Sequence, residues 1–193
     1  MAAKYWELVI DGPKGWDLGF LRGYLSGKGL DGNLVDLEEE GFDCEPYREK
    51  VRELLNPEQD TLHVVVPEGA LDGVTEALGE SAAAGRPMTL RHRRPLSGAG
   101  FGFSLRVYSR EHGARFLAFF RNLPAGARLV EEEPLREKQD PDSKGVELYA
   151  PSHDYELTGR GRVEGAFDAV LEAYRFCRRE DLIHQERAEV RPE

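Results

Sequence analysis

The sequence predicts an α+β protein in which one order of strands and helices occurs twice. Two observations support this prediction. Residues 68–77 align without a gap on residues 164–173, and seven of the ten positions are identical. Earlier in each half, Leu, Phe, Arg, Gly and Leu recur at the same spacing in residues 18–30 and 117–129. Because both matches occur in the same order at nearly equal offsets, they indicate an internal duplication of a unit of about 95 residues.

The predicted elements follow the same order in both halves. Alternating apolar residues predict strands, and apolar residues three or four positions apart predict helices. The first half has predicted strands at 5–10, 33–37, 61–66 and 88–94 and helices at 16–24 and 70–78. The second half has predicted strands at 101–108, 128–132, 155–162 and 183–190 and helices at 116–120 and 166–174. The order βαββαβ predicts a tandem duplication of a ferredoxin-like unit, in which an antiparallel sheet carries its helices on one face.

The predicted domains are residues 1–95 and residues 99–193. The first differs from the second by an additional helix near residues 46–55, where apolar side chains recur at helical spacing. At the equivalent place the second has a polar loop, residues 138–145.

A short linker is expected between the halves at residues 95–100. The neighbouring glycines of residues 98–102 precede a strand, whereas a phosphate-binding glycine loop lies between a strand and a helix. We therefore interpret them as the hinge of the duplication.

The charge balance bears on the partners. The formal net charge is -10, with 40% hydrophobic and 32% charged residues, which is typical of a folded, well-solvated protein. Binding to a phosphate backbone over the whole surface needs concentrated Lys and Arg, so we expect nucleic acid not to be a partner, while local basic patches stay open. The start of the chain has no signal-peptide pattern and no segment reaches the length of a membrane span. The sequence therefore predicts a cytoplasmic protein with no membrane partner.

The residue types that carry most enzymatic chemistry do not form a recognisable set. Cys44 and Cys177 are far apart in the sequence, and the five histidines have no spacing typical of metal ligands. We therefore expect no metal and no cofactor, assign no catalytic residue, and favour a protein without enzymatic activity.

Arginines on two predicted strands give the candidate site. Alternation places Arg106 and Tyr108 on one face of the strand 101–108, and Arg160 and Arg162 on one face of the strand 155–162. The first and third strands are neighbours at the centre of a ferredoxin-like sheet, so these side chains should share its open face. Arginine is a bidentate donor to phosphate and carboxylate, which predicts an anion-binding site. The alternative is that these arginines are solvated and pair with the abundant acids.

Arg91 and Arg93 of the first half are expected to lie on the same open face and to add donors to this site.

The sequence defines no specific activity, and three classes of function stay open. The first is a non-enzymatic ligand-sensing or regulatory module, with an anionic small molecule as the candidate ligand; the duplication and the lack of a recognisable catalytic set favour it. The second is an enzyme whose site lies between the halves or between subunits. The third is an assembly protein that forms a homo-oligomer through the open sheet faces.

Overall fold

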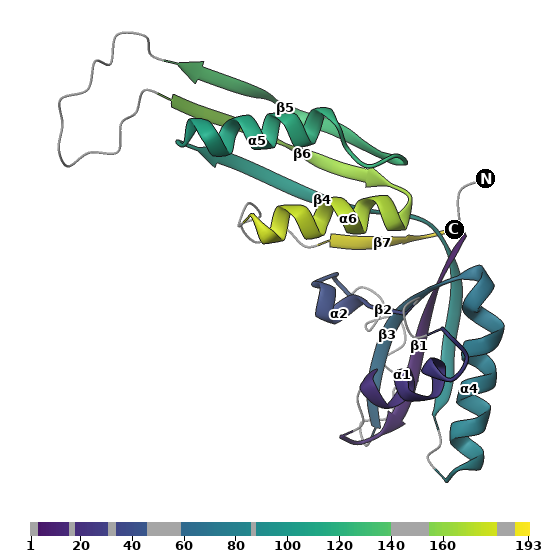
Figure 1. Ribbon diagram of the computed structural model, residues 1–193. Coiled ribbons are helices and arrows are strands. Elements are labelled where there is room, and N and C mark those ends of the chain that lie inside the picture. Colours follow the sequence, from purple (N-terminus) through teal and green to yellow (C-terminus); the bar gives the residue numbers. More distant parts are fainter. Residues whose placement is uncertain are drawn as a thin grey trace. The chain divides into compact units, whose positions relative to one another are not determined.

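The structure is a computed structural model of the 193-residue chain. It describes residues 4–15, 18–30, 34–45, 59–85, 88–139, 155–180 and 188–193. The chain divides into two compact units, which Figure 1 shows with their elements labelled. Unit 1 comprises Met1–Gly98 and Glu189–Glu193, and unit 2 comprises Ala99–Ala188.

The elements alternate between strands and helices along the chain. Unit 1 contains β1 (Tyr5–Pro13), α1 (Leu18–Ser26), β2 (Val35–Asp36), α2 (Leu37–Glu40), β3 (Gln59–Pro67), the 3-10 turn η3 (Glu68–Ala70) and α4 (Leu71–Ala83). The long strand β4 (Thr89–Val107) begins in unit 1 and ends in unit 2. It is followed by α5 (Arg110–Arg121), β5 (Ala127–Gln139), β6 (Tyr155–Gly165), α6 (Phe167–Arg179) and β7 (Ala188–Pro192).

The described strands form a seven-stranded antiparallel open sheet. Their order is β2-β3-β1-β4-β6-β5, and β7 pairs with β4. The first residues of β4, Thr89–Leu96, pair with β1, whereas its last residues, Ala99–Val107, pair with β6. Five α-helices accompany these strands in the part of the chain that the structure describes, so the fold is α+β.

The core of unit 1 lies between its strands and the helices α1 and α4. Leu8 and Ile10 alternate along β1 with residues of the other face, and both are fully buried. From the helices, Leu21, Leu25 and Val74 pack into the same cluster. Alternate side chains of β1 thus pack against the apolar faces of α1 and α4, as the sequence predicted.

The segment after β2 is fixed by a capped one-turn helix. The Asp36 carboxylate accepts hydrogen bonds from the backbone N–H groups of Glu38 (2.9 Å) and Glu39 (3.1 Å), which caps the start of α2. Burial raises the pKa of this carboxyl group above its usual value. Gly41, with φ of 89°, ends α2 in the left-handed conformation that glycine adopts without strain. This turn directs the following residues back toward the sheet.

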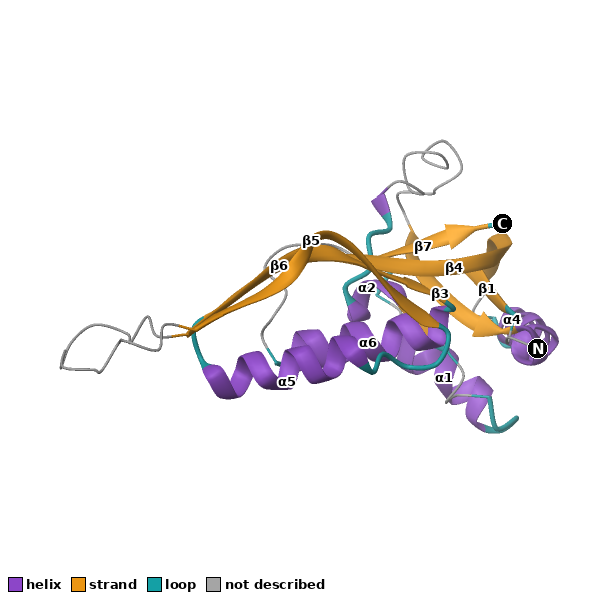
Figure 2. Ribbon diagram, turned by 90° about the horizontal axis from the view of Figure 1, so that it is seen from above, coloured by secondary structure: helices purple, strands orange, loops and turns teal. Residues whose placement is uncertain are grey.

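The helices α5 and α6 of unit 2 lie on one face of its strands, as Figure 2 shows. Aromatic contacts hold them there. On β4, the rings of Phe101 and Phe103 are buried. Phe103 stacks on Phe120 of α5 at 4.5 Å between centroids, and Phe101 contacts Tyr174 of α6 at 5.2 Å. Such ring pairs add to the free energy of burying their apolar area.

Two glycines on the helix-facing side of β6 allow a close approach of its neighbours. A Cβ at Gly161 would lie 2.5 Å from the carbonyl oxygen of Val130 and 3.2 Å from Cζ of Phe103. A Cβ at Gly159 would lie 2.6 Å from Cδ2 of Leu135. The space that side chains would occupy at these two positions is therefore filled by β5 and by the core.

The predicted boundaries need three corrections. Residues 95–100, predicted to be a linker, belong to the continuous strand β4, because their backbone groups pair in the sheet despite the proline and glycines. The strand predicted at 128–132 extends to Gln139, so the first two residues of the predicted loop 138–145 are strand. The helix predicted at 116–120 begins six residues earlier, where Ser109 caps it by accepting a hydrogen bond from the His112 N–H.

Several sequence predictions lie outside the described residues. These are the additional helix at 46–55, the rest of the polar loop, residues 140–145, and the first part of the closing strand, residues 183–187. Within the described ranges, no helix combines the length and the apolar composition that crossing a membrane requires.

The close approach at Gly161 predicts a large effect of adding one methyl group. We expect Gly161→Ala to lower the free energy of unfolding by about 1–3 kcal/mol, because the backbone oxygen of Val130 cannot move without disturbing its strand. The control is Gly79→Ala on α4, where a Cβ meets open space; this change should stabilise the protein by about 0.5–1 kcal/mol. Urea unfolding followed by circular dichroism measures both, and an unchanged midpoint for Gly161→Ala contradicts the packing described.

Candidate anion-binding face

The arginines predicted from the sequence lie on one face of the unit 2 sheet. Arg106 is on β4 and pairs in register with Thr158 of β6, while Ser104 of β4 pairs with Arg160. Arg162 is two residues further along β6 and pairs with Gly102. Directly paired residues share a face, and the intervening residues of both strands are buried on the helix side. Arg106, Arg160 and Arg162 therefore point away from α5 and α6.

Tyr108 follows the last residue of β4 and is one of the two large apolar side chains most exposed among the described residues, at 42%. The guanidinium carbon of Arg106 lies 5.7 Å from the centroid of its ring. This distance is within the range of a cation–π contact, so the two side chains form one stacked unit at the end of β4.

Each of the three arginines also has a carboxylate partner. Nε of Arg106 lies 2.8 Å from Glu156, Nε of Arg160 lies 3.1 Å from Glu132, and Nε of Arg162 lies 3.5 Å from Glu164. The hydrogen bond with Glu156 raises the pKa of Arg106 above its usual value. The alternative interpretation of the sequence, that these arginines pair with acids, thus describes real contacts, and a binding role has to coexist with them.

Strand β5 adds three cations that the sequence prediction missed. Arg128 pairs in register with Glu164, Arg136 with Thr158, and Lys138 with Glu156. Their partners Glu164, Thr158 and Glu156 are on the same face of β6 as Arg160 and Arg162. The three β5 cations therefore share that face. We define the basic face as the six side chains Arg106, Arg128, Arg136, Lys138, Arg160 and Arg162.

The irregular register of β5 explains why Arg136 and Lys138 were missed, whereas Arg128 lies before the irregularity. The pairing of β5 with β6 shifts between Glu131 and Glu133 and again between Glu133 and Arg136. Each shift breaks the two-residue alternation from which a face is read in the sequence. The available signal was the cluster of Arg136 and Lys138 itself, but without the register neither residue could be assigned to a face.

Charge is layered at the two ends of the basic face. There the acids are covered, with 25% of the Glu156 side chain and 14% of Glu164 exposed, whereas the exposed fractions are 69% for Arg106 and 75% for Arg128. In the middle of the face, Glu132 and Glu133 are exposed beside Arg160. A ligand that approaches either end therefore meets guanidinium groups before it meets carboxylates. The carboxylates beneath restrict the arginine side chains, so less conformational entropy remains to be lost on binding.

The chemistry of this arrangement suits phosphate. A guanidinium group has five N–H donors in a planar fork, and the ion pairs of Arg106 and Arg160 are made through Nε. Same-face neighbours such as Arg160 and Arg162 are separated by about 7 Å, so one phosphate group can lie between two donors. Ion pairs between exposed side chains are weak because water screens them, and a multiply charged anion can compete with them.

The corresponding face of unit 1 is covered rather than open. On β1, Glu7, Val9 and Asp11 point away from the helix-side core and are buried, as is His63 of β3. Phe42, from the segment after α2, is buried as well. This face of unit 1 therefore differs from the face of unit 2 that carries the exposed arginines.

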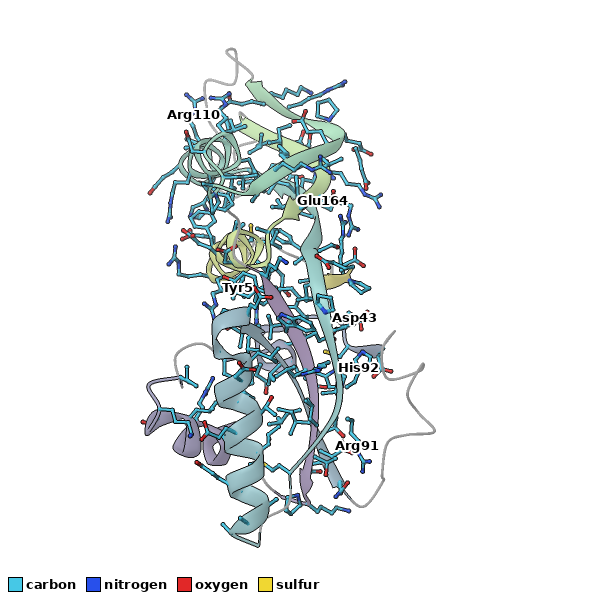
Figure 3. All side chains as sticks on the ribbon, turned by 90° about the vertical axis from the view of Figure 1, so that its right-hand side faces the viewer. Tyr5, Asp43, Arg91, His92, Arg110 and Glu164 are labelled. Carbon is cyan, nitrogen blue, oxygen red and sulfur yellow. The ribbon has the colours of Figure 1, made fainter. Side chains whose placement is uncertain are left out.

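Arginines of β4 neutralise the two buried acids of β1. Nε of Arg91 lies 2.7 Å from the Asp11 carboxylate, which also accepts a hydrogen bond from Thr61 at 2.8 Å, and Arg94 pairs with Glu7. A shift in the pairing of β1 with β4 next to Val9 brings Arg91 to Asp11. In Figure 3, Arg91 lies with His92 and Asp43 on the side of the sheet away from α4.

Arg91 and Arg93, the two further arginines that the sequence suggested for the anion site, both lie in unit 1. Arg91 belongs to unit 1, where it is bound to Asp11, and Arg93 is exposed and pairs in register with Leu8. Neither is part of the basic face as defined above.

The two thiols are buried and poorly acidic. Burial raises the pKa of both Cys44 and Cys177 to about 12, so the thiolate form that acts as nucleophile or metal ligand is scarce near neutral pH. Among the residues that the structure describes, no three His, Cys, Asp or Glu side chains come together as metal ligands.

Comparison with known proteins shows a distant structural similarity and no family match. No family model matches the sequence, and no curated protein matches it. Among solved structures, the chain is similar to Csf5, a CRISPR-Cas type IV Cas6 crRNA endonuclease, with 12% sequence identity and a TM-score of 0.24. The match covers 84% of this chain and 90% of Csf5.

The similarity to an RNA-processing enzyme contradicts the expectation that nucleic acid is not a partner. That expectation rested on the overall net charge of -10, which leaves local basic patches open. On the basic face, by contrast, cations outnumber acids, so the overall charge does not exclude a polyanion there. At this TM-score the neighbour defines neither the fold nor the activity of the chain.

The buried pair Glu7–Arg94 gives a prediction for stability. We expect Arg94→Ala to lower the free energy of unfolding by about 3–5 kcal/mol, because Glu7, 1% exposed, would lose its cation inside the protein. Arg93→Ala is the matched control, since it removes the same charge from an exposed neighbour and should cost less than about 0.5 kcal/mol. Equal urea midpoints for the two variants would show that the Glu7 pair does not support unit 1.

Proposed function

We propose that unit 2 is a binding module that holds phosphate groups on its basic face without transforming them. The observation that carries this proposal is the layering of charge at the two ends of the basic face, where the highly exposed Arg106 and Arg128 lie above the more covered Glu156 and Glu164. Acids in that position restrain the arginines, while the outer donors face the solvent. Phosphate has several acceptor oxygens, so it can accept charge-assisted hydrogen bonds from more than one guanidinium group at once.

We also propose that the two halves of the sequence, residues 1–95 and 99–193, are ferredoxin-like repeats. Two findings support this. The helices α4 and α6 both have 13 residues and begin and end at positions equivalent in the duplicated sequence. The strand orders β4-β1-β3-β2 and β7-β4-β6-β5 also correspond when the strands are numbered within each half.

The buried positions of α4 and α6 also correspond. The buried residues of α4 are Val74, Ala77, Leu78 and Ser81, and those at the equivalent positions of α6 are Val170, Ala173, Tyr174 and Cys177, all buried. In this proposal unit 1 has covered its second sheet face and unit 2 has kept it for binding.

Binding of pyrophosphate tests the proposed function. Isothermal titration should detect binding to the wild-type protein, and Arg160→Ala combined with Arg162→Ala should weaken it at least about tenfold, since two charge-assisted donors are lost. The matched control combines Arg115→Ala with Arg121→Ala, which removes two charges from α5 on the opposite side of the sheet. Its affinity should stay within about twofold of the wild-type value.

A second pair of variants separates geometry from charge. Arg160→Lys combined with Arg162→Lys keeps both charges but loses the planar fork, so its affinity should fall between those of the wild-type and alanine proteins. Absence of pyrophosphate binding by the wild-type protein, or equal losses in the alanine and control variants, would refute the proposed function.

A further inference from the structure

We infer that the natural ligand of the basic face is a single strand of nucleic acid whose backbone follows β5 and β6. This inference rests on the proposed function, because it identifies the bearer of the phosphate groups. It goes further in requiring that several phosphates are bound at once and that bases stack on the same face.

The length of the basic face is the first argument. Its cations are spread over the stretch of β6 from Glu156 to Glu164 and the paired residues of β4 and β5. At about 3.3 Å per residue this stretch is about 26 Å long. A small phosphate ester could contact two or three of the six cations, whereas a strand with a phosphate on every nucleotide can contact all of them.

The cations also lie in two neighbouring rows. One row is on β5 and contains Arg128, Arg136 and Lys138; the other runs from Arg162 and Arg160 on β6 to Arg106 on β4. The neighbouring strands β5 and β6 are about 4.8 Å apart, so the donors of Arg160 and Arg162 and those of β5 reach the space between these two strands. Arg106 lies one strand further, on β4. A backbone lying along this space can alternate between the rows, as in the charged grooves that hold single strands.

A stacking surface lies at one end of these rows. The Tyr108 ring is 42% exposed and carries the Arg106 guanidinium group 5.7 Å from its centroid. Bases stack on aromatic rings and on guanidinium planes whatever their sequence. Bases inside a duplex are already stacked on one another, so this surface favours an unpaired strand.

A hollow in the middle of the face offers a place for a backbone group. It has a volume of about 250 Å³ and is lined by Glu133, Pro134, Arg136, Thr158 and Gly159, where β5 departs from regular pairing. The Thr158 hydroxyl group and the Arg136 guanidinium group are donors for a phosphate or sugar oxygen. The bulge of β5 thus interrupts the flat sheet between the two ends of the cation rows.

The remaining charge of the chain favours binding at this face. The basic face has six cations against the four acids Glu132, Glu133, Glu156 and Glu164, whereas the whole chain has a formal net charge of -10. Negative charge elsewhere repels a phosphate backbone, so it lowers the affinity of competing surfaces. The overall acidity therefore adds selectivity for this face.

Fluorescence anisotropy with labelled oligouridylate and oligothymidylate of about 12 nucleotides tests the inference. Pyrophosphate and uridine monophosphate serve as competitors that carry phosphate but cannot span the face. We expect both oligonucleotides to bind at least about tenfold more tightly than either competitor. The slope of log affinity against log salt should be about -4 if all six cations contact phosphates. The ratio of the two affinities shows whether RNA or DNA is preferred.

Variants separate the cation rows from the stacking surface. Arg128→Ala combined with Arg136→Ala should reduce the salt slope by about 1.4, whereas the control Arg115→Ala with Arg121→Ala should leave it unchanged. Tyr108→Ala should weaken binding about tenfold without changing the slope, and Tyr108→Phe should restore it. A general loss of folding would instead weaken oligonucleotide binding in all of these variants alike.

Three results would overturn the inference. If pyrophosphate binds as tightly as the oligonucleotides, the face holds phosphate but not a strand, and the proposed function stands. If polyglutamate of equal charge competes as well as the oligonucleotides, the face recognises acidic chains instead. If neither pyrophosphate nor the oligonucleotides bind, both the inference and the proposed function fail.

Discussion

The lack of space on the helix side of β6 determines the rest of unit 2. At Gly159 and Gly161 the neighbouring strand and the core lie where side chains would otherwise be, so only one register of β6 fits. A slip by one residue would turn Arg160 and Arg162 inward and the glycines outward. The packing that holds α5 and α6 against the sheet, through contacts such as Phe103 with Phe120, therefore also keeps the arginines on the outer face.

The same chemical pair has different consequences in the two units because its burial differs. In unit 1, Asp11 is fully buried and bound by both Arg91 and Thr61. These contacts link β1 to β4 and β3 and stabilise the sheet. In unit 2, the arginines above Glu156 and Glu164 remain largely in water. Removing a partner from a buried pair leaves an unsolvated charge, whereas an exposed pair can exchange its partner at little cost. This contrast supports a structural role for the first set and a binding role for the second.

Local patterns in the sequence predicted the elements with regular periods and missed features that depend on distant residues. The alternation of β6 and the apolar stripe of α6 gave the strand, the helix and the shared face of Arg106, Arg160 and Arg162. The burial of Glu7 could not be foreseen, because its partner Arg94 is 87 residues away. The continuity of β4 was missed since a proline and glycines usually end a strand. Arg136 and Lys138 of β5 were missed because two register shifts interrupt its alternation before them.

The central claim is that ligands bind the sheet face of unit 2 opposite α5 and α6. An NMR titration of the 15N-labelled protein with pyrophosphate locates the contact directly, because side-chain Nε signals of arginines report on their hydrogen bonds. The account predicts that Arg106, Arg160 and Arg162 shift together with the backbone amides of neighbouring residues on β4, β5 and β6, while Arg115 and Arg121 of α5 stay unchanged. Shifts confined to α5 and α6, with none on the basic face, would contradict it.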